Sequence, residues 1–127
     1  MVLAGVLMKC LDTYALVEIH DGNPKFVHLL SEEIIITDIT LAEFYGVLYK
    51  RYGKLTAEYW NKKLDPFCRA VSRQTLLQAA AFRIENNQQN LSFFDCVGYM
   101  FSLENNYTFV TGDKEFEKKK GVELLKK

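Results

Sequence analysis

The sequence predicts an α/β protein whose mainly parallel sheet is covered by helices on both faces. β-Prone apolar runs at residues 6–11, 34–37 and 107–111 alternate with segments whose apolar side chains recur at helical spacing. This alternation is typical of parallel strands, which need long crossover connections. A length of 127 residues with 49% hydrophobic residues suffices for one sizeable core, so we assign residues 1–127 to a single domain.

The first third of the chain predicts two strands and two helices. The strands are the buried run at 6–11, which ends at Asp12, and the β-branched run at 34–37. The helices occupy residues 14–19 and about 24–30, where a proline suits the first helical position.

Three features define the middle of the chain. Thr40 is the expected N-cap of a helix that ends near Gly53, and Glu43 completes a capping box with it. A second helix spans residues 56–64 and stops before a proline. A third starts after Ser72, while residues 67–71 between the two stay unassigned.

The stretch 91–116 predicts a helix, a turn and a strand. Ser92 is the expected N-cap, and helical spacing breaks at residues 104–106 before the strand at 107–111. Residues 122–125 are expected to add a last strand at the edge of the sheet.

Four acids are predicted to meet at one edge of this sheet. Asp12 and Asp113 follow strand ends, whereas Glu43 and Asp95 occupy the first turns of helices that begin at the same edge. Ligands of open α/β sheets bind beyond the carboxyl ends of the strands. Each acid also has a structural interpretation, because helix caps and turns favour the same residues. Capping explains each acid singly but not their shared position.

Clustered carboxylates repel one another, so such a group must take up protons or bind a cation. Oxygen-only ligands favour Mg²⁺ or Mn²⁺, and the chemistry that these ions support in an acidic site is phosphodiester hydrolysis. The sequence has no Gly-rich phosphate loop and no Ser or Cys nucleophile paired with a His.

The cysteines and the N-terminus indicate where in the cell the protein is expected. Cys10 and Cys96 lie among apolar neighbours and the three cysteines show no metal spacing, so we expect free thiols in a reducing cytoplasm. The apolar N-terminus is interrupted by Lys9 and is too short to span a membrane, and it lacks signal-peptide features.

Four motifs in order resemble a PIN domain of the small prokaryotic VapC-like type. They are Leu11-Asp12-Thr13, Ile39-Thr40-Leu41-Ala42-Glu43, Asp95-Cys96-Val97-Gly98-Tyr99 and Phe109-Val110-Thr111-Gly112-Asp113-Lys114-Glu115-Phe116. The resemblance covers nearly the whole chain. It implies a three-layer α/β/α fold with a four- to five-stranded sheet and a Mg²⁺- or Mn²⁺-dependent endoribonuclease. The implied catalytic and metal-binding quartet is Asp12, Glu43, Asp95 and Asp113.

The resemblance also implies auxiliary roles for Thr111 and Glu115 and, in the first motif, for Thr13 and Tyr14. The family usually has Ser or Asn where this chain has Tyr14. Its phenol either replaces the supporting hydrogen bond or fills part of the cleft. A homodimer and, if the protein is a toxin, a small antitoxin partner are implied as well.

The expected substrate is single-stranded or loop RNA, because its backbone is more accessible than that of a duplex. Residues 44–84 contain eight basic residues against two acids, whereas residues 1–43 contain seven acids against two lysines. The basic middle either holds the phosphates or is only a solvated helix face. The RNA-binding candidates are Arg51, Lys54, Arg69 and Arg73.

Other functions stay open. A non-catalytic PIN-like RNA-binding or assembly module shares the sequence pattern, and so does an RNA-processing nuclease without an antitoxin. A receiver domain is similar in length and layering, but it needs paired acids after its first strand and a late Lys before Pro, and the chain has neither.

Overall fold

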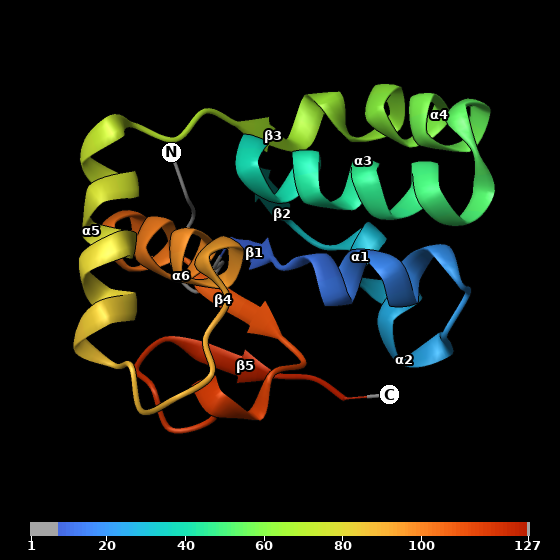
Figure 1. The fold of residues 1–127 in the computed structure, drawn as a ribbon. Helices are drawn as coiled ribbons and strands as arrows, with labels where there is room; N and C mark the ends of the chain where they lie inside the picture. Colours follow the sequence, from blue (N-terminus) through green and yellow to red (C-terminus); the bar gives the residue numbers. More distant parts are fainter. Residues whose placement is uncertain (1–7, 127) are drawn as a thin grey trace.

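Five parallel strands form one sheet within residues 8–126, the part of the chain that the computed structural model describes. The order is β3-β2-β1-β4-β5 (Figure 1). The central strand β1 (Lys9–Leu11) pairs with β2 (Ile34–Thr37) on one side and β4 (Thr108–Thr111) on the other. The edge strands β3 (Cys68–Arg69) and β5 (Val122–Leu124) are short. The predicted parallel α/β class is confirmed.

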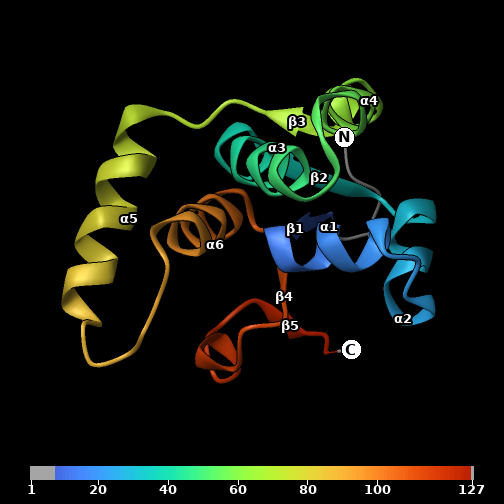
Figure 2. The ribbon, with the colours of Figure 1, turned by 45° about the vertical axis from the view of Figure 1, so that its right-hand side comes forward.

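The helices connect the strands and cover the sheet on both faces. They are α1 (Thr13–His20), α2 (Pro24–Val27), α3 (Asp38–Tyr52), α4 (Lys54–Leu64), α5 (Arg73–Glu85) and α6 (Phe93–Asn105), with short 3-10 turns η1 (His28–Ser31), η2 (Asp65–Phe67) and η3 (Lys114–Phe116). Figures 1 and 2 show α4 alongside α3, and α5 outermost beside α6. None of the described helices is both long and apolar enough to cross a membrane.

Alternating side chains of the strands form two cores. Leu11, Ile36 and Val110 pack with helices α1 to α4 on one face of the sheet. Cys10 and Phe109 pack with α5 and α6 on the other. This period of two is what a sheet buried on both faces requires, and it gives the three layers that the PIN resemblance implied.

Helix α6 lies very close to the sheet because of one glycine. A Cβ placed on Gly98 would lie 2.7 Å from Cε1 of Phe109 in β4. Only a residue without a side chain allows this approach. The start of α6, which carries Asp95, is therefore held near the end of β4.

One prediction about the middle of the chain was wrong. Helix α3 begins at Asp38, because the side chain of Thr37 caps it by accepting a hydrogen bond from the N–H of Thr40 at 3.0 Å. Thr40 is a buried helical residue, so the predicted capping box does not form and Glu43 lies beyond the first turn. Strand β3, which is two residues long, occupies part of the stretch that the sequence left unassigned.

The other boundaries shifted less. Helix α6 continues to Asn105, so it includes two of the residues 104–106 at which the helix was expected to end. Asn106 ends it in the left-handed conformation with φ of 59°. Residues 6 and 7 of the first predicted strand lie outside the described residues. The predicted caps at Asp12 and Ser92 are confirmed, each by a hydrogen bond that its side-chain oxygen accepts from a backbone N–H of the helix. The helix expected after Ser72 is α5, and the side chain of Ser72 caps it in the same way.

Candidate active site

A cavity of about 310 Å³ opens where β1 and β4 end. Its lining residues are Asp12, Thr13, Tyr14, Glu43, Ser92, Asp95, Gly112 and Asp113. The fold therefore brings all four acids of the predicted quartet to one cavity, although they come from four separate parts of the chain. The described residues that line the cavity include no Lys, Arg or His.

Asp12 is buried, with 2% of its surface exposed, and it caps α1 through a 2.8 Å hydrogen bond from the N–H of Ala15. Its carboxylate also accepts hydrogen bonds from the backbone of Gly112 and the hydroxyl of Thr111. Burial outweighs these donors and, together with repulsion from Glu43, raises the pKa of Asp12 to about 6. Capping and a place in the cavity thus coexist in one residue.

Glu43 reaches the cavity from the second turn of α3. The hydroxyl of Thr13, at the start of α1, donates a hydrogen bond to its carboxylate. This bond joins the helices that follow β1 and β2 and orients Glu43 toward Asp12. Since no capping box forms here, helix capping does not account for Glu43.

Asp95 lies in the first turn of α6, and its N–H donates to Ser92 Oγ at 3.0 Å. Burial raises the pKa of its carboxyl to about 8, and repulsion from Asp12, Glu43 and Asp113 adds to the effect. A hydrogen bond with the side chain of Ser92 lowers the pKa of Asp95 and so opposes these effects. The mutual repulsion shows that the four carboxyls are close enough to act on one another.

Asp113 is fixed by the turn that follows β4. Its N–H donates to Thr111 Oγ1 at 3.0 Å, and its Oδ1 accepts from the N–H of Glu115 at 2.9 Å. Thr111 therefore links Asp12 and Asp113 through one buried hydroxyl. Glu115 does not line the cavity, and its carboxylate instead accepts a hydrogen bond from Gln89 at 3.2 Å.

The chemistry of the cavity fits a hard divalent cation, although the carboxylates are too widely spaced to hold one as they stand. Within residues 8–126, no three His, Cys, Asp or Glu side chains are grouped closely enough for a metal ion. The four carboxylates nevertheless repel one another, and no basic residue in the cavity wall offsets them. Oxygen donors of this kind suit Mg²⁺ or Mn²⁺.

Tyr14 forms one wall of the cavity. Its ring packs directly onto Gly112, and its centroid lies 5.7 Å from that of Phe26 in an edge-to-face arrangement. The ring thus fills part of the cleft, which was one of the two outcomes expected for this departure from the family pattern.

The four basic candidates lie in two separate places, and none lines the cavity. Arg51 and Lys54 flank the turn between α3 and α4. Arg69 ends β3 and donates to the carbonyls of Pro66 and Cys68, and Arg73 begins α5. They therefore do not form one continuous rim.

Two cavity residues, Ser92 and Gly112, are not identified by the sequence as members of the site. The sequence indicates Ser92 only as a cap and Gly112 only as a turn residue. The sequence could have indicated both residues through their neighbours. Ser92 lies close to Asp95 and Gly112 precedes Asp113, so each lies at the sheet edge where these acids were expected.

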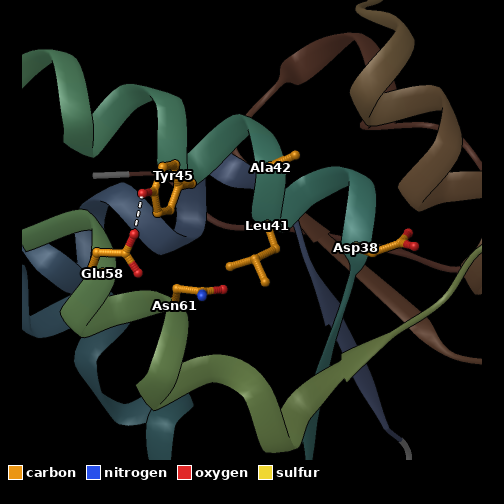
Figure 3. A pocket seen from close by; sticks show the side chains of 6 residues that line it. All are labelled: Asp38, Leu41, Ala42, Tyr45, Glu58 and Asn61. Carbon is orange, nitrogen blue, oxygen red and sulfur yellow. Dashed lines mark hydrogen bonds between the residues drawn. The ribbon is translucent and has the colours of Figure 1, made fainter. Parts of the chain in front are cut away.

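A second cavity, of about 420 Å³, lies between α3 and α4. Figure 3 shows Tyr45 and Glu58 facing each other across it, joined by a 2.7 Å hydrogen bond. Leu41 and Ala42 line this cavity while Glu43 lines the first, so α3 separates the two. The second cavity begins at Asp38, just after β2, but its lining includes no residue of the quartet.

The sequence profile of the PIN domain matches residues 9–122. No curated protein sequence matches the chain. Solved structures with the same fold include VapC20 of Mycobacterium tuberculosis, described as a toxin that cleaves the sarcin-ricin loop. It is 17% identical with a TM-score of 0.75, and the match covers 92% of this chain and 98% of that one.

Two further structures are of toxin–antitoxin systems. A toxin–antitoxin complex from Klebsiella pneumoniae is 20% identical, with a TM-score of 0.75 and coverage of 91% and 95% of the two chains. VapBC2 from Rickettsia felis, bound to a DNA fragment from its promoter, is 18% identical, with a TM-score of 0.75 and coverage of 95% and 99%. At these identities the likeness establishes the fold.

Proposed function

Because this chain belongs to the PIN domain family, we propose that it is a metal-dependent endoribonuclease that hydrolyses RNA phosphodiesters. The observation that carries the proposal is the meeting of Asp12, Glu43, Asp95 and Asp113 in one cavity whose lining residues include no basic side chain. These four acids are the proposed catalytic residues and the proposed ligands of Mg²⁺ or Mn²⁺. When bound, such an ion supplies the Lewis acidity that activates water and offsets charge on phosphate oxygens.

The chain's own hydrogen bonds support defined roles around these acids. Thr111 and the N–H groups of Ala15 and Gly112 hold Asp12 in one orientation, and Thr13 does the same for Glu43. Thr111 and Thr13 are therefore proposed as positioning residues, whereas the contact between Glu115 and Gln89 favours an indirect role for Glu115.

The proposed partners follow from the family. We infer that the chain is a toxin held by a small antitoxin, because structures with the same fold include toxin–antitoxin complexes. A homodimer is supported by exposed apolar side chains on the outer face of α5, where Leu77 and Ile84 are 64% and 71% exposed. The free cysteines Cys10, Cys68 and Cys96 favour the cytoplasm.

The test of the activity is cleavage of an unstructured RNA by the purified protein. With Mg²⁺ or Mn²⁺ we expect internal cleavage, and with EDTA we expect none. Asp113→Asn should be inactive under both conditions, which excludes a contaminating nuclease. Binding without cleavage, at any metal concentration, would instead favour the non-catalytic RNA-binding module. If the protein cleaves RNA and no antitoxin that inhibits the cleavage co-purifies with it, an RNA-processing nuclease is the better description.

The RNA-binding surface can be mapped in the inactive Asp113→Asn protein. Removing the positive charges of Arg51, Lys54, Arg69 and Arg73 is expected to weaken binding and to flatten its dependence on salt, since each neutralised phosphate releases counterions. Fluorescence anisotropy against salt concentration measures both effects.

The two places in which these residues lie allow a sharper design. The pairs Arg51/Lys54 and Arg69/Arg73 should be replaced by Gln separately, with Lys25→Gln on α2 as a control outside the basic middle. The expectation is wrong if neither pair changes the affinity or the salt slope, and the basic middle is then only a solvated face.

A further inference from the structure

Tyr14 and Gly112 form a matched pair in the cavity wall. A Cβ on Gly112 would lie 2.7 Å from Cζ of Tyr14 and closer still to two other ring carbons. The ring can therefore occupy its position only because residue 112 has no side chain. Phe26 contacts the ring from α2, with the two planes at 68°. The ring is thus fixed between the end of β4 and the second helix.

The ring differs chemically from the other groups of the cavity. Four carboxylates and two hydroxyls surround it, and these bind cations and accept or donate hydrogen bonds. The ring of Tyr14 supplies a flat, polarisable, largely apolar surface beside Asp12 and Gly112. A phosphate offers no matching surface, and a ribose offers only a small, non-planar C–H face. In an RNA chain the matching group is a nucleobase, which stacks well on aromatic side chains.

We propose that Tyr14 is a specificity-determining residue that packs against the base of the nucleotide next to the scissile phosphate. This inference rests on the proposed ribonuclease function. A base that contacts Tyr14 cannot remain stacked and paired in a duplex, so the contact selects an unpaired nucleotide at the cleavage site. Stacking of one base on an aromatic side chain contributes between roughly fivefold and a hundredfold in affinity.

The experiment compares Tyr14→Phe, which keeps the ring, with Tyr14→Leu, which keeps an apolar side chain but cannot stack. The substrates are one single-stranded RNA oligomer and copies with a single abasic ribose on either side of the cleavage site. Tyr14→Phe should retain the wild-type KM. Tyr14→Leu should raise KM by roughly fivefold to a hundredfold and should change kcat much less. Wild type and Tyr14→Phe should bind one of the abasic copies less tightly than the intact oligomer. Tyr14→Leu should bind the intact and abasic oligomers equally.

Gly112→Ala provides a second, independent variant. Its Cβ should displace the ring and reproduce the KM increase of Tyr14→Leu. In a Tyr14→Ser background the same Ala should have little further effect, because the overlapping ring is gone. This non-additivity reports the contact between the two residues.

Affinities of the same oligomers for the variants in the Asp113→Asn background, measured by fluorescence anisotropy, do not depend on turnover. If Tyr14→Leu binds intact and abasic oligomers as Tyr14→Phe does, the inference is overturned while the nuclease proposal stands. If wild type cleaves no RNA but binding still depends on the ring and the base, the nuclease proposal fails and the base contact holds.

Discussion

Replacing both Asp12 and Asp113 with Asn is expected to abolish the thermal stabilisation that we expect Mg²⁺ or Mn²⁺ to give the wild-type protein. It should also lower RNA cleavage by on the order of a hundredfold or more. A ligand that binds only the folded state at a hundred times its Kd stabilises by about 2.7 kcal/mol, or roughly 10 °C for a domain of this size. The double variant lacks two of the four carboxylates of the cavity, so it should lose this gain. Differential scanning fluorimetry with and without metal measures it.

Without metal, the double variant should unfold close to the wild-type temperature. Neutral amides of the same shape remove repulsion with Glu43 and Asp95, and this gain offsets the hydrogen bonds that the amide nitrogens cannot accept. The matched control is Glu33→Gln with Glu117→Gln, two exposed acids outside the cavity. A metal response that survives in full in the Asp12/Asp113 variant, or disappears in the control, contradicts the assignment of the cation site.

Asp95→Asn is expected to stabilise the metal-free protein at alkaline pH. The folded state raises the pKa of Asp95 to about 8, well above the value of about 3.9 for an unfolded chain. The folded protein therefore binds a proton that the unfolded chain has lost, and the stability that this proton contributes disappears as the pH rises from about 4 to about 8. Asn does not titrate, so its advantage should grow over this range and reach on the order of 5 kcal/mol at pH 8.

Urea unfolding in EDTA at pH 5 and pH 8 measures this difference. Asp38→Asn is a suitable control, because Asp38 also lies in the first turn of a helix but is exposed. It should lose a small amount of stability at both pH values through the helix dipole. An Asp95→Asn protein that is no more stable than wild type at pH 8 would show that Asp95 is not held in a repulsive, buried cluster.

The sequence was sufficient for the features that depend on local chemistry. The run Ile34–Thr37 was predicted with its observed bounds, since four β-branched residues have few alternatives. The meeting of Asp12 and Asp113 followed from topology alone, because parallel strands end at one edge and β1 and β4 are neighbours. Asp12 is both a helix cap and a residue of the cavity, so its two interpretations did not exclude each other.

What the sequence could not decide depended on distant contacts. Thr37 and Thr40 are equally good caps, and Thr37 caps the helix because β2 ends there. Strand β3 exists only through its pairing with β2. The contact of Tyr14 with Gly112 joins residues almost a chain length apart. The basic residues form a cluster in the sequence, but the α3–α4 hairpin separates them in space.

The central position of β1 also bears on how the protein is made. The first strand to be synthesised has β4, among the last, as one of its two neighbours, with Cys10 opposite Phe109. Ribosomes add about 5–20 residues per second, so β1 waits several seconds with one edge unpaired. Contacts so distant in sequence form slowly, because a long loop must close first. The acidic cavity therefore cannot assemble on a nascent chain until β4 and Asp113 have emerged. We expect the proposed nuclease activity to be absent until that point of translation.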